Sequence, residues 1–109
     1  MQNKKIIIIE DDKISNGFLR KALSEFFTVE SYYDGQTGLE GIHKSKPDLI
    51  LLDLMMPGVN GFDVLTDLKA HSPELLEKVI IMSNSSENNF VATALEYNVT
   101  SFIVKGDYD

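Results

Sequence analysis

The chain alternates between short apolar runs and longer stretches in which apolar residues recur at helical spacing. The uninterrupted runs at residues 6–9 and 49–52 are typical of strands buried on both faces of a parallel sheet. The pattern predicts strands over residues 5–10, 29–33, 48–52, 79–83 and 101–105. Strict alternation of strands and helices favours an α/β fold with a doubly wound parallel sheet, because parallel strands need crossovers that cover both faces.

Helical segments are predicted between these strands. They cover residues 13–26 and 36–45, a stretch that follows Asn60-Gly61, and a stretch around residues 90–95 with Ser85 or Ser86 as its cap. The first helix carries two apolar lines, one with Ile14 and Phe18 and the other with Leu19 and Leu23. The second helix is predicted to be weak, because each of its internal glycines costs roughly 1 kcal/mol relative to alanine.

Composition is typical of one globular domain, and we expect it to cover residues 1–109. The hydrophobic fraction is 43%, which is enough for a core, and no apolar run is long enough to span a membrane or serve as a signal peptide. The absence of cysteine excludes disulfides and thiolate metal sites and fits the reducing cytoplasm. The net charge of −7 argues against direct binding of nucleic acid.

Acidic residues follow two of the predicted strands. Glu10 and Asp11 come directly after the first apolar run, and Asp53 comes directly after the run at residues 49–52. Functional groups in doubly wound sheets gather outside the carboxyl ends of the strands, so these carboxylates are expected to share one crevice. Carboxylates at such short range repel one another unless a cation lies among them, and Mg²⁺ prefers oxygen ligands. The sequence therefore predicts a magnesium site there.

The ends of the other strands carry groups that suit phosphoryl chemistry. The Asp53 carboxylate can attack phosphorus and form an aspartyl phosphate. Two anions must approach each other in that reaction, so Lys105, at the end of the last strand, is expected to supply positive charge. Ser83 offers a hydroxyl that can donate a hydrogen bond to a phosphoryl oxygen.

Together these residues closely resemble the receiver domain of bacterial two-component response regulators, of the chemotaxis-regulator type. The resemblance rests on the segment IIIIEDD at residues 6–12, on PDLILLDLMMPGVNG at residues 47–61, and on Ser83 and Lys105. It covers essentially the whole chain. It implies a flavodoxin-like strand order 2-1-3-4-5 and a switch in signal transduction that assists its own phosphorylation rather than an enzyme that turns over substrate.

The resemblance also implies a role for each matching residue. Asp53 matches the phosphoacceptor. For the metal, Asp11 matches the direct Mg²⁺ ligand, Glu10 matches its partner acting through water, and Met55 matches the position whose backbone carbonyl completes the site. Ser83 matches the switch hydroxyl, Lys105 matches the lysine that pairs with the phosphate, and Phe102 matches the aromatic switch position. The implied phosphoryl donor is a phosphohistidine on a sensor histidine kinase or a phosphotransfer protein. The downstream protein target is not identified by these motifs.

The chain departs from the family pattern at three places. Gly106 follows the lysine where the family usually has proline, and Asn84 follows Ser83 where the family often has a small residue. The fifth helix of the family is missing, so the domain is predicted to be truncated and to leave apolar surface uncovered. The output face and this uncovered face are candidate surfaces for a homodimer.

Three other functions can be weighed against the receiver. A haloacid-dehalogenase-type phosphatase would need an aspartate where Met55 stands, and a flavodoxin-like cofactor binder would need a phosphate-binding loop where the acids at residues 10–12 stand. A receiver-fold interaction module that is never phosphorylated stays open as the alternative. Asp12 is as compatible with a charge at a helix N-terminus as with a metal contact. His43 and His71 are predicted to be solvated and without a partner.

Overall fold

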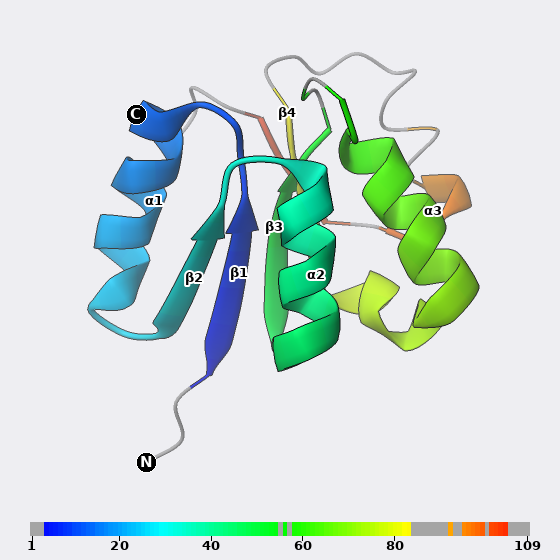
Figure 1. Ribbon diagram of the computed structural model, residues 1–109, viewed down its shortest axis with the longest axis horizontal. Helices are drawn as coiled ribbons and strands as arrows, with labels where there is room; N and C mark the ends of the chain where they lie inside the picture. The colour runs from blue at the N-terminus through cyan, green and yellow to red at the C-terminus, as the bar shows by residue number, and fades with distance from the viewer. Residues whose placement is uncertain are drawn as a thin grey trace.

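A computed structural model describes residues 4–54, 56, 58–83, 92, 95–99 and 101–104. Its strands are β1 (Lys5–Ile9), β2 (Thr28–Tyr32), β3 (Leu49–Asp53), β4 (Val79–Ser83) and β5 (Ser101–Val104). They form one parallel sheet in the order β2-β1-β3-β4-β5 (Figure 1). The α/β class and the strand order expected from the sequence are therefore confirmed.

The helices are α1 (Lys13–Ser24), α2 (Gly35–Ser45) and α3 (Gly61–His71), and a 3₁₀ helix, η1 (Pro73–Lys78), precedes β4. The sequence pattern did not predict η1, and it placed the end of α1 two residues too late. Most of the fourth predicted helix and both of its candidate caps lie outside the described residues. No described helix combines the length and the apolar character that a membrane crossing requires.

Successive residues of the central strands face opposite sides of the sheet, as the period of two in a strand requires. Ile7 and Ile9 of β1 belong to a core cluster with residues of α2 and α3, whereas Ile6 and Ile8 belong to a second cluster. Leu19 and Leu23 of α1 pack against that second cluster. The sheet is thus covered by α2 and α3 on one face and by α1 on the other. Because the strands are parallel, the polar residues at their carboxyl ends lie at the same end of the sheet.

Only one of the two apolar lines on α1 packs against the sheet. Leu19 and Leu23 do so, while Ile14 is 85% exposed and Phe18 is 54% exposed. The two lines point in different directions from the helix axis, so only one of them can face the sheet. The other line consequently lies on the outer surface of the protein.

The glycines of α2 allow this helix to lie close to the sheet. A Cβ atom at Gly38 would clash with the side chain of Ile9, and one at Gly41 would clash with the ring of Tyr32. The N-terminus of α2 is stabilised by Asp34, whose side chain accepts a hydrogen bond from the backbone N–H of Thr37 at 2.8 Å. The glycines that weaken the helix in isolation are therefore needed for its packing.

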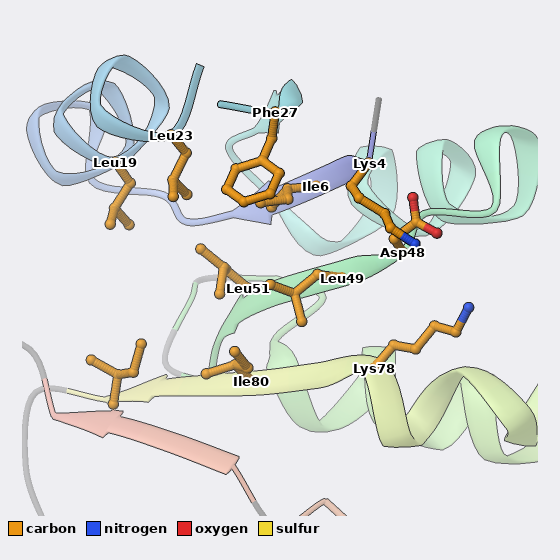
Figure 2. Close-up of a pocket in the computed structure, with 11 residues that line it drawn as sticks. Lys4, Ile6, Leu19, Leu23, Phe27, Asp48, Leu49, Leu51, Lys78 and Ile80 are labelled. Atoms are coloured by element: carbon orange, nitrogen blue, oxygen red, sulfur yellow. The ribbon is translucent and has the colours of Figure 1, made fainter. Parts of the chain in front are cut away.

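An apolar groove lies on the face of the sheet that α1 covers only in part (Figure 2). It has a volume of 580 Å³, and Lys4, Asp48 and Lys78 lie together toward one end of it. The other lining residues are apolar: Ile6, Leu19, Leu23, Phe27, Leu49, Leu51, Ile80 and Ile103. The expectation that a fifth helix is missing from the domain stays a prediction.

His43 is exposed, as expected, but it has a partner, which corrects the expectation that it would be alone. Its Nε2 atom lies 2.8 Å from Oδ1 of Asp67, so the contact joins α2 to α3. The two residues are 24 positions apart and belong to different helices. They lie close together because α2 and α3 pack side by side. His71 is exposed, as expected.

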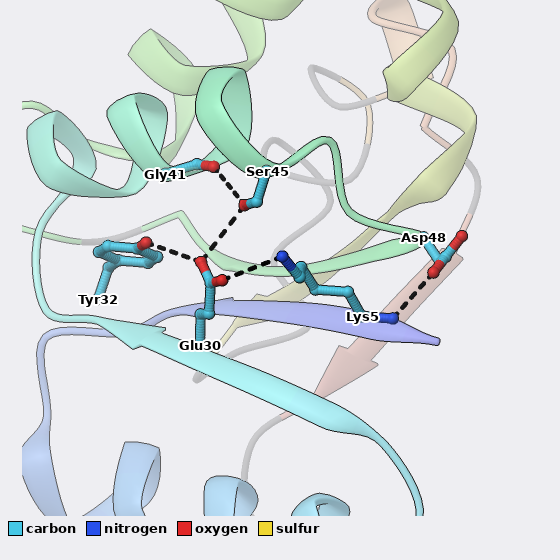
Figure 3. Close-up of polar contacts among 6 residues, drawn as sticks. All are labelled: Lys5, Glu30, Tyr32, Gly41, Ser45 and Asp48. Atoms are coloured by element: carbon cyan, nitrogen blue, oxygen red, sulfur yellow. Dashed lines mark hydrogen bonds and ion pairs between the residues drawn. The ribbon is translucent and has the colours of Figure 1, made fainter. Parts of the chain in front are cut away.

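A polar network joins β1, β2 and α2 (Figure 3). The carboxylate of Glu30 lies 3.3 Å from Nζ of Lys5 and accepts hydrogen bonds from the hydroxyls of Tyr32 at 2.9 Å and Ser45 at 3.3 Å. The backbone N–H of Lys5 also donates to the carboxylate of Asp48 at 2.8 Å. The network ties the edge strand β2 to its neighbours.

Glu30 is expected to make the stability of the fold depend on pH. Partial burial would raise the pKa of Glu30, but hydrogen bonds from Tyr32 and Lys5 and the charge of Lys5 outweigh it, so the pKa falls below 4.5. A lowered pKa in the folded state contributes stability above the unfolded pKa, and this is lost as the pH falls through the folded pKa. Glu30→Gln should therefore destabilise the protein at neutral pH by up to about 1 kcal/mol, and by less in acid.

Urea unfolding of the parent and of Glu30→Gln at neutral pH and at about pH 3.5 measures this difference. Glu40→Gln, at an exposed carboxylate of α2 outside the network, is the matched control and should show no such dependence. A difference between parent and Glu30→Gln that stays the same at both pH values would contradict the assignment.

Candidate metal centre

Three carboxylates meet at the carboxyl edge of the sheet. Glu10 and Asp11 directly follow β1, and Asp53 is the last residue of β3. These strands are neighbours, with Ile9 paired to Leu52, so their ends lie side by side. One candidate ligand oxygen from each carboxylate lies within 4.8 Å of the others. The clustering of these three carboxylates that the sequence predicted is therefore present.

The burial of these carboxylates is unequal. Glu10 has no exposed surface and Asp53 is 2% exposed, whereas Asp11 is accessible to solvent. Buried carboxylates in close proximity repel one another strongly, and a cation among them removes that repulsion. The arrangement therefore favours a bound cation that is reached from the side of Asp11.

Hydrogen bonds fix Glu10 at three points. Its backbone N–H donates to the carbonyl oxygen of Tyr32 at 3.1 Å, and its own carbonyl oxygen accepts from Nδ2 of Asn16 at 3.0 Å. Its carboxylate accepts a hydrogen bond from the backbone N–H of Asp12 at 3.0 Å. The turn between β1 and α1 is thereby held in one conformation, and with it the acidic pair.

Asp12 caps α1. Its side chain accepts hydrogen bonds from the backbone N–H of Ile14 at 3.1 Å and from the hydroxyl of Ser15 at 3.0 Å. Side-chain caps of this kind satisfy helix N–H groups that have no partner within the helix. The helix-end interpretation of Asp12 is thus the one that the geometry supports.

The segment that follows Asp53 is held by α3. The backbone N–H of Gly61 donates to the carbonyl oxygen of Leu54 at 3.1 Å. Asn60 and Asp63 form a capping box at the start of the helix, with side-chain to backbone bonds of 3.0 and 3.1 Å. A Cβ atom at Gly61 would lie 2.5 Å from the carbonyl oxygen of Asp53. The helix can therefore approach the end of β3 only because residue 61 is glycine.

The cluster fits Mg²⁺ in chemistry and in size. This ion takes oxygen ligands at 2.0–2.1 Å, so two ligands on opposite sides of it lie about 4.2 Å apart. The three carboxylate oxygens lie within 4.8 Å of one another, which is close enough for them to share one ion once the side chains move inward. Glu10, Asp11 and Asp53 are accordingly the residues that would hold the ion.

The remaining predicted site residues are placed only in part. Met55 and Lys105 lie outside the described residues. Ser83 ends β4, the neighbour of β3, so its backbone lies at the same edge of the sheet as Asp53. Phe102 of β5 is partly buried against the core cluster that α2 and α3 cover. Sequence reasoning did not single out Asn16, which is buried and bonded to Glu10.

The chain is similar to known proteins over a segment that includes these site residues. The family model of the response regulator receiver domain matches residues 6–107. The chain is 34% identical over 108 residues to protein-glutamate methylesterase/protein-glutamine glutaminase 3 of Geobacter sulfurreducens, covering 96% of the chain and 28% of that protein. It is 33% identical over 102 residues to the response regulator ArlR of Staphylococcus saprophyticus, covering 93% and 45%. The chain thus spans less than half of each relative.

A solved structure extends the likeness to three dimensions. The phosphorylated cyanobacterial phytochrome response regulator RcpA matches with a TM-score of 0.86 and 28% identity, over 97% of this chain and 83% of that one. The segment that the family model matches includes Glu10, Asp11 and Asp53.

Proposed function

The chain belongs to the response regulator receiver domain family, and on that premise we propose that Asp53 accepts a phosphoryl group in a Mg²⁺-dependent reaction. The observation that carries the proposal is the position of Asp53, almost fully buried and within 4.8 Å of the carboxylates of Glu10 and Asp11. A lone buried aspartate would be a poor site for a second anion, whereas one beside two metal-binding carboxylates is well suited to it.

The proposed reaction transfers a phosphoryl group from a donor nitrogen to Asp53. An oxygen of the Asp53 carboxylate forms a bond to phosphorus, and the bond between phosphorus and the donor nitrogen breaks. The electron pair of that bond stays on the imidazole of the donor. Glu10, Asp11, Asp53 and the backbone carbonyl of Met55 would hold Mg²⁺, and the bound ion would neutralise charge on the reacting oxygens. Lys105 and the Ser83 hydroxyl bind the transferred group.

The signal is proposed to leave the site through β4 and β5. Ser83 ends β4, and Lys105 directly follows β5 in the sequence. Both would move toward the phosphoryl group and so bias the domain between two packings. Phe102 of β5, partly buried against the core, would change its side-chain conformation with them. We propose a phosphohistidine of a sensor histidine kinase or phosphotransfer protein as the donor, and a protein partner as the reader of the switched face.

Phosphoryl uptake is expected to require a divalent cation. Incubation with Mg²⁺ and acetyl phosphate should add the mass of one phosphoryl group to the intact protein, and an excess of chelator should prevent it, because carboxylate repulsion then opposes the incoming anion. Intact-mass spectrometry measures the adduct, and calorimetric titration measures Mg²⁺ binding. Binding of Mg²⁺ without any adduct would instead favour a receiver-fold interaction module that is never phosphorylated.

A further inference from the structure

Asn16 is a polar side chain buried inside the domain. It lies in the second turn of α1 and has no exposed surface. Its Nδ2 atom donates to the carbonyl oxygen of Glu10 at 3.0 Å and to the carbonyl oxygen of Tyr32 at 3.0 Å. A buried amide at such a position needs a reason, because burial of polar groups is unfavourable unless they are bonded.

The two acceptors identify which atom of the amide is the nitrogen. Both neighbours are carbonyl oxygens, and only the nitrogen of an amide can donate to them. The Oδ1 atom of Asn16 is buried and accepts no hydrogen bond from the described residues. An unsatisfied buried acceptor is destabilising, so an apolar residue would be preferred here if the two donated bonds had no value.

These bonds act on the peptide group that joins two candidate metal ligands. The carbonyl of Glu10 belongs to the planar peptide between Glu10 and Asp11, so its direction sets how both side chains leave the backbone. The carbonyl of Tyr32 also accepts from the N–H of Glu10 at 3.1 Å. One amide of Asn16 therefore joins α1 to the ends of β1 and β2 at the residue where the acidic pair begins.

We propose that Asn16 is a positioning residue of the metal site, which orients the Glu10–Asp11 peptide so that both carboxylates face Asp53. This inference rests on the proposed function, since it assigns Asn16 a role in binding Mg²⁺. Residues that orient metal ligands typically change metal affinity by about 10- to 100-fold when they are replaced. A purely structural asparagine would change stability without changing the affinity of the folded protein.

The test compares Asn16→Leu with Ile42→Val. Leucine has the same branched shape and no donor, so it releases both carbonyls. Ile42 is fully buried, and it lines a hollow together with Pro47. Pro47 lies just before the start of β3, whereas the acidic residues lie at the opposite end of the strands. Ile42→Val weakens the core without touching the site. Calorimetric titration with Mg²⁺, and electron paramagnetic resonance with Mn²⁺, measure affinity in each folded variant, and urea unfolding in chelator measures stability.

Asn16→Leu is expected to bind Mg²⁺ about 10- to 100-fold more weakly than the parent, while Ile42→Val binds as the parent does. If the leucine variant does not fold, Asn16→Ser, which retains one donor, takes its place and should also bind more weakly. Parental affinity in the folded Asn16 variant would overturn this inference and leave the proposed function standing. A parent that binds no divalent cation would overturn both.

Discussion

Replacing Asp53 with Asn is expected to abolish phosphorylation and leave the fold intact. The amide is close in size to the carboxylate, so it fits the same nearly closed site, but it lacks the nucleophilic oxygen that must bond to phosphorus. It also removes one of three clustered charges, so the metal-free protein should be no less stable than the parent. Intact mass after incubation with Mg²⁺ and acetyl phosphate should show the adduct in the parent alone, and urea unfolding measures stability.

Asp67→Asn is the matched control for that experiment. Asp67 lies on α3, outside the acidic cluster, where it contacts His43. It should take up a phosphoryl group as the parent does. Retention of the adduct in Asp53→Asn would place the phosphoacceptor elsewhere, and its loss in both variants would point to a general defect rather than to the loss of one nucleophile.

Replacing Gly61 with Ala is expected to damage the fold and the site together. The added Cβ would lie 2.5 Å from the Asp53 carbonyl oxygen and 2.5 Å from Cα of Leu54, and these backbone atoms cannot move without shifting the end of β3. Overpacking of this kind lowers the free energy of unfolding by about 1–3 kcal/mol. Displacement of Asp53 should also slow phosphorylation. Urea unfolding in chelator and the rate of adduct formation measure the two effects.

The same substitution at Gly17 should have the opposite effect on stability. Gly17 lies within α1, and a Cβ atom there would meet nothing within 4 Å. Alanine should therefore stabilise the helix by about 0.5–1 kcal/mol. Parental stability and parental phosphorylation rate in Gly61→Ala would mean that α3 is free to move away from β3, contrary to the geometry described above.

The elements that could be predicted from sequence are those with a strong local signal. Continuous apolar runs identified β1 and β3, and strict alternation of strands and helices fixed the doubly wound class. Once those strands were parallel and adjacent, Glu10, Asp11 and Asp53 had to meet at one edge, which the structure confirms. Prediction succeeded where local pattern and general rules of sheet topology were sufficient.

Other features depend on contacts between distant segments and carry no local signal. The choice between the two apolar lines of α1 is made by the sheet, and the contact of His43 with Asp67 is made by the packing of two helices. Asn16 in a helix has the same sequence appearance whether it is solvated or buried, so its bonds to two strand ends could not be foreseen. The 3₁₀ helix η1 is short and has no periodicity to detect.

The position of β1 in the sheet has a consequence for the order in which parts of the domain open. β1 is hydrogen-bonded to β2 on one side and to β3 on the other, and Ile7, Ile8 and Ile9 have no exposed surface. Amide hydrogens in such strands exchange with solvent only through the largest unfolding events. The backbone that carries Glu10 and Asp11 therefore belongs to the slowest-exchanging unit, and partial opening of β5 at the sheet edge would leave these two ligands in place.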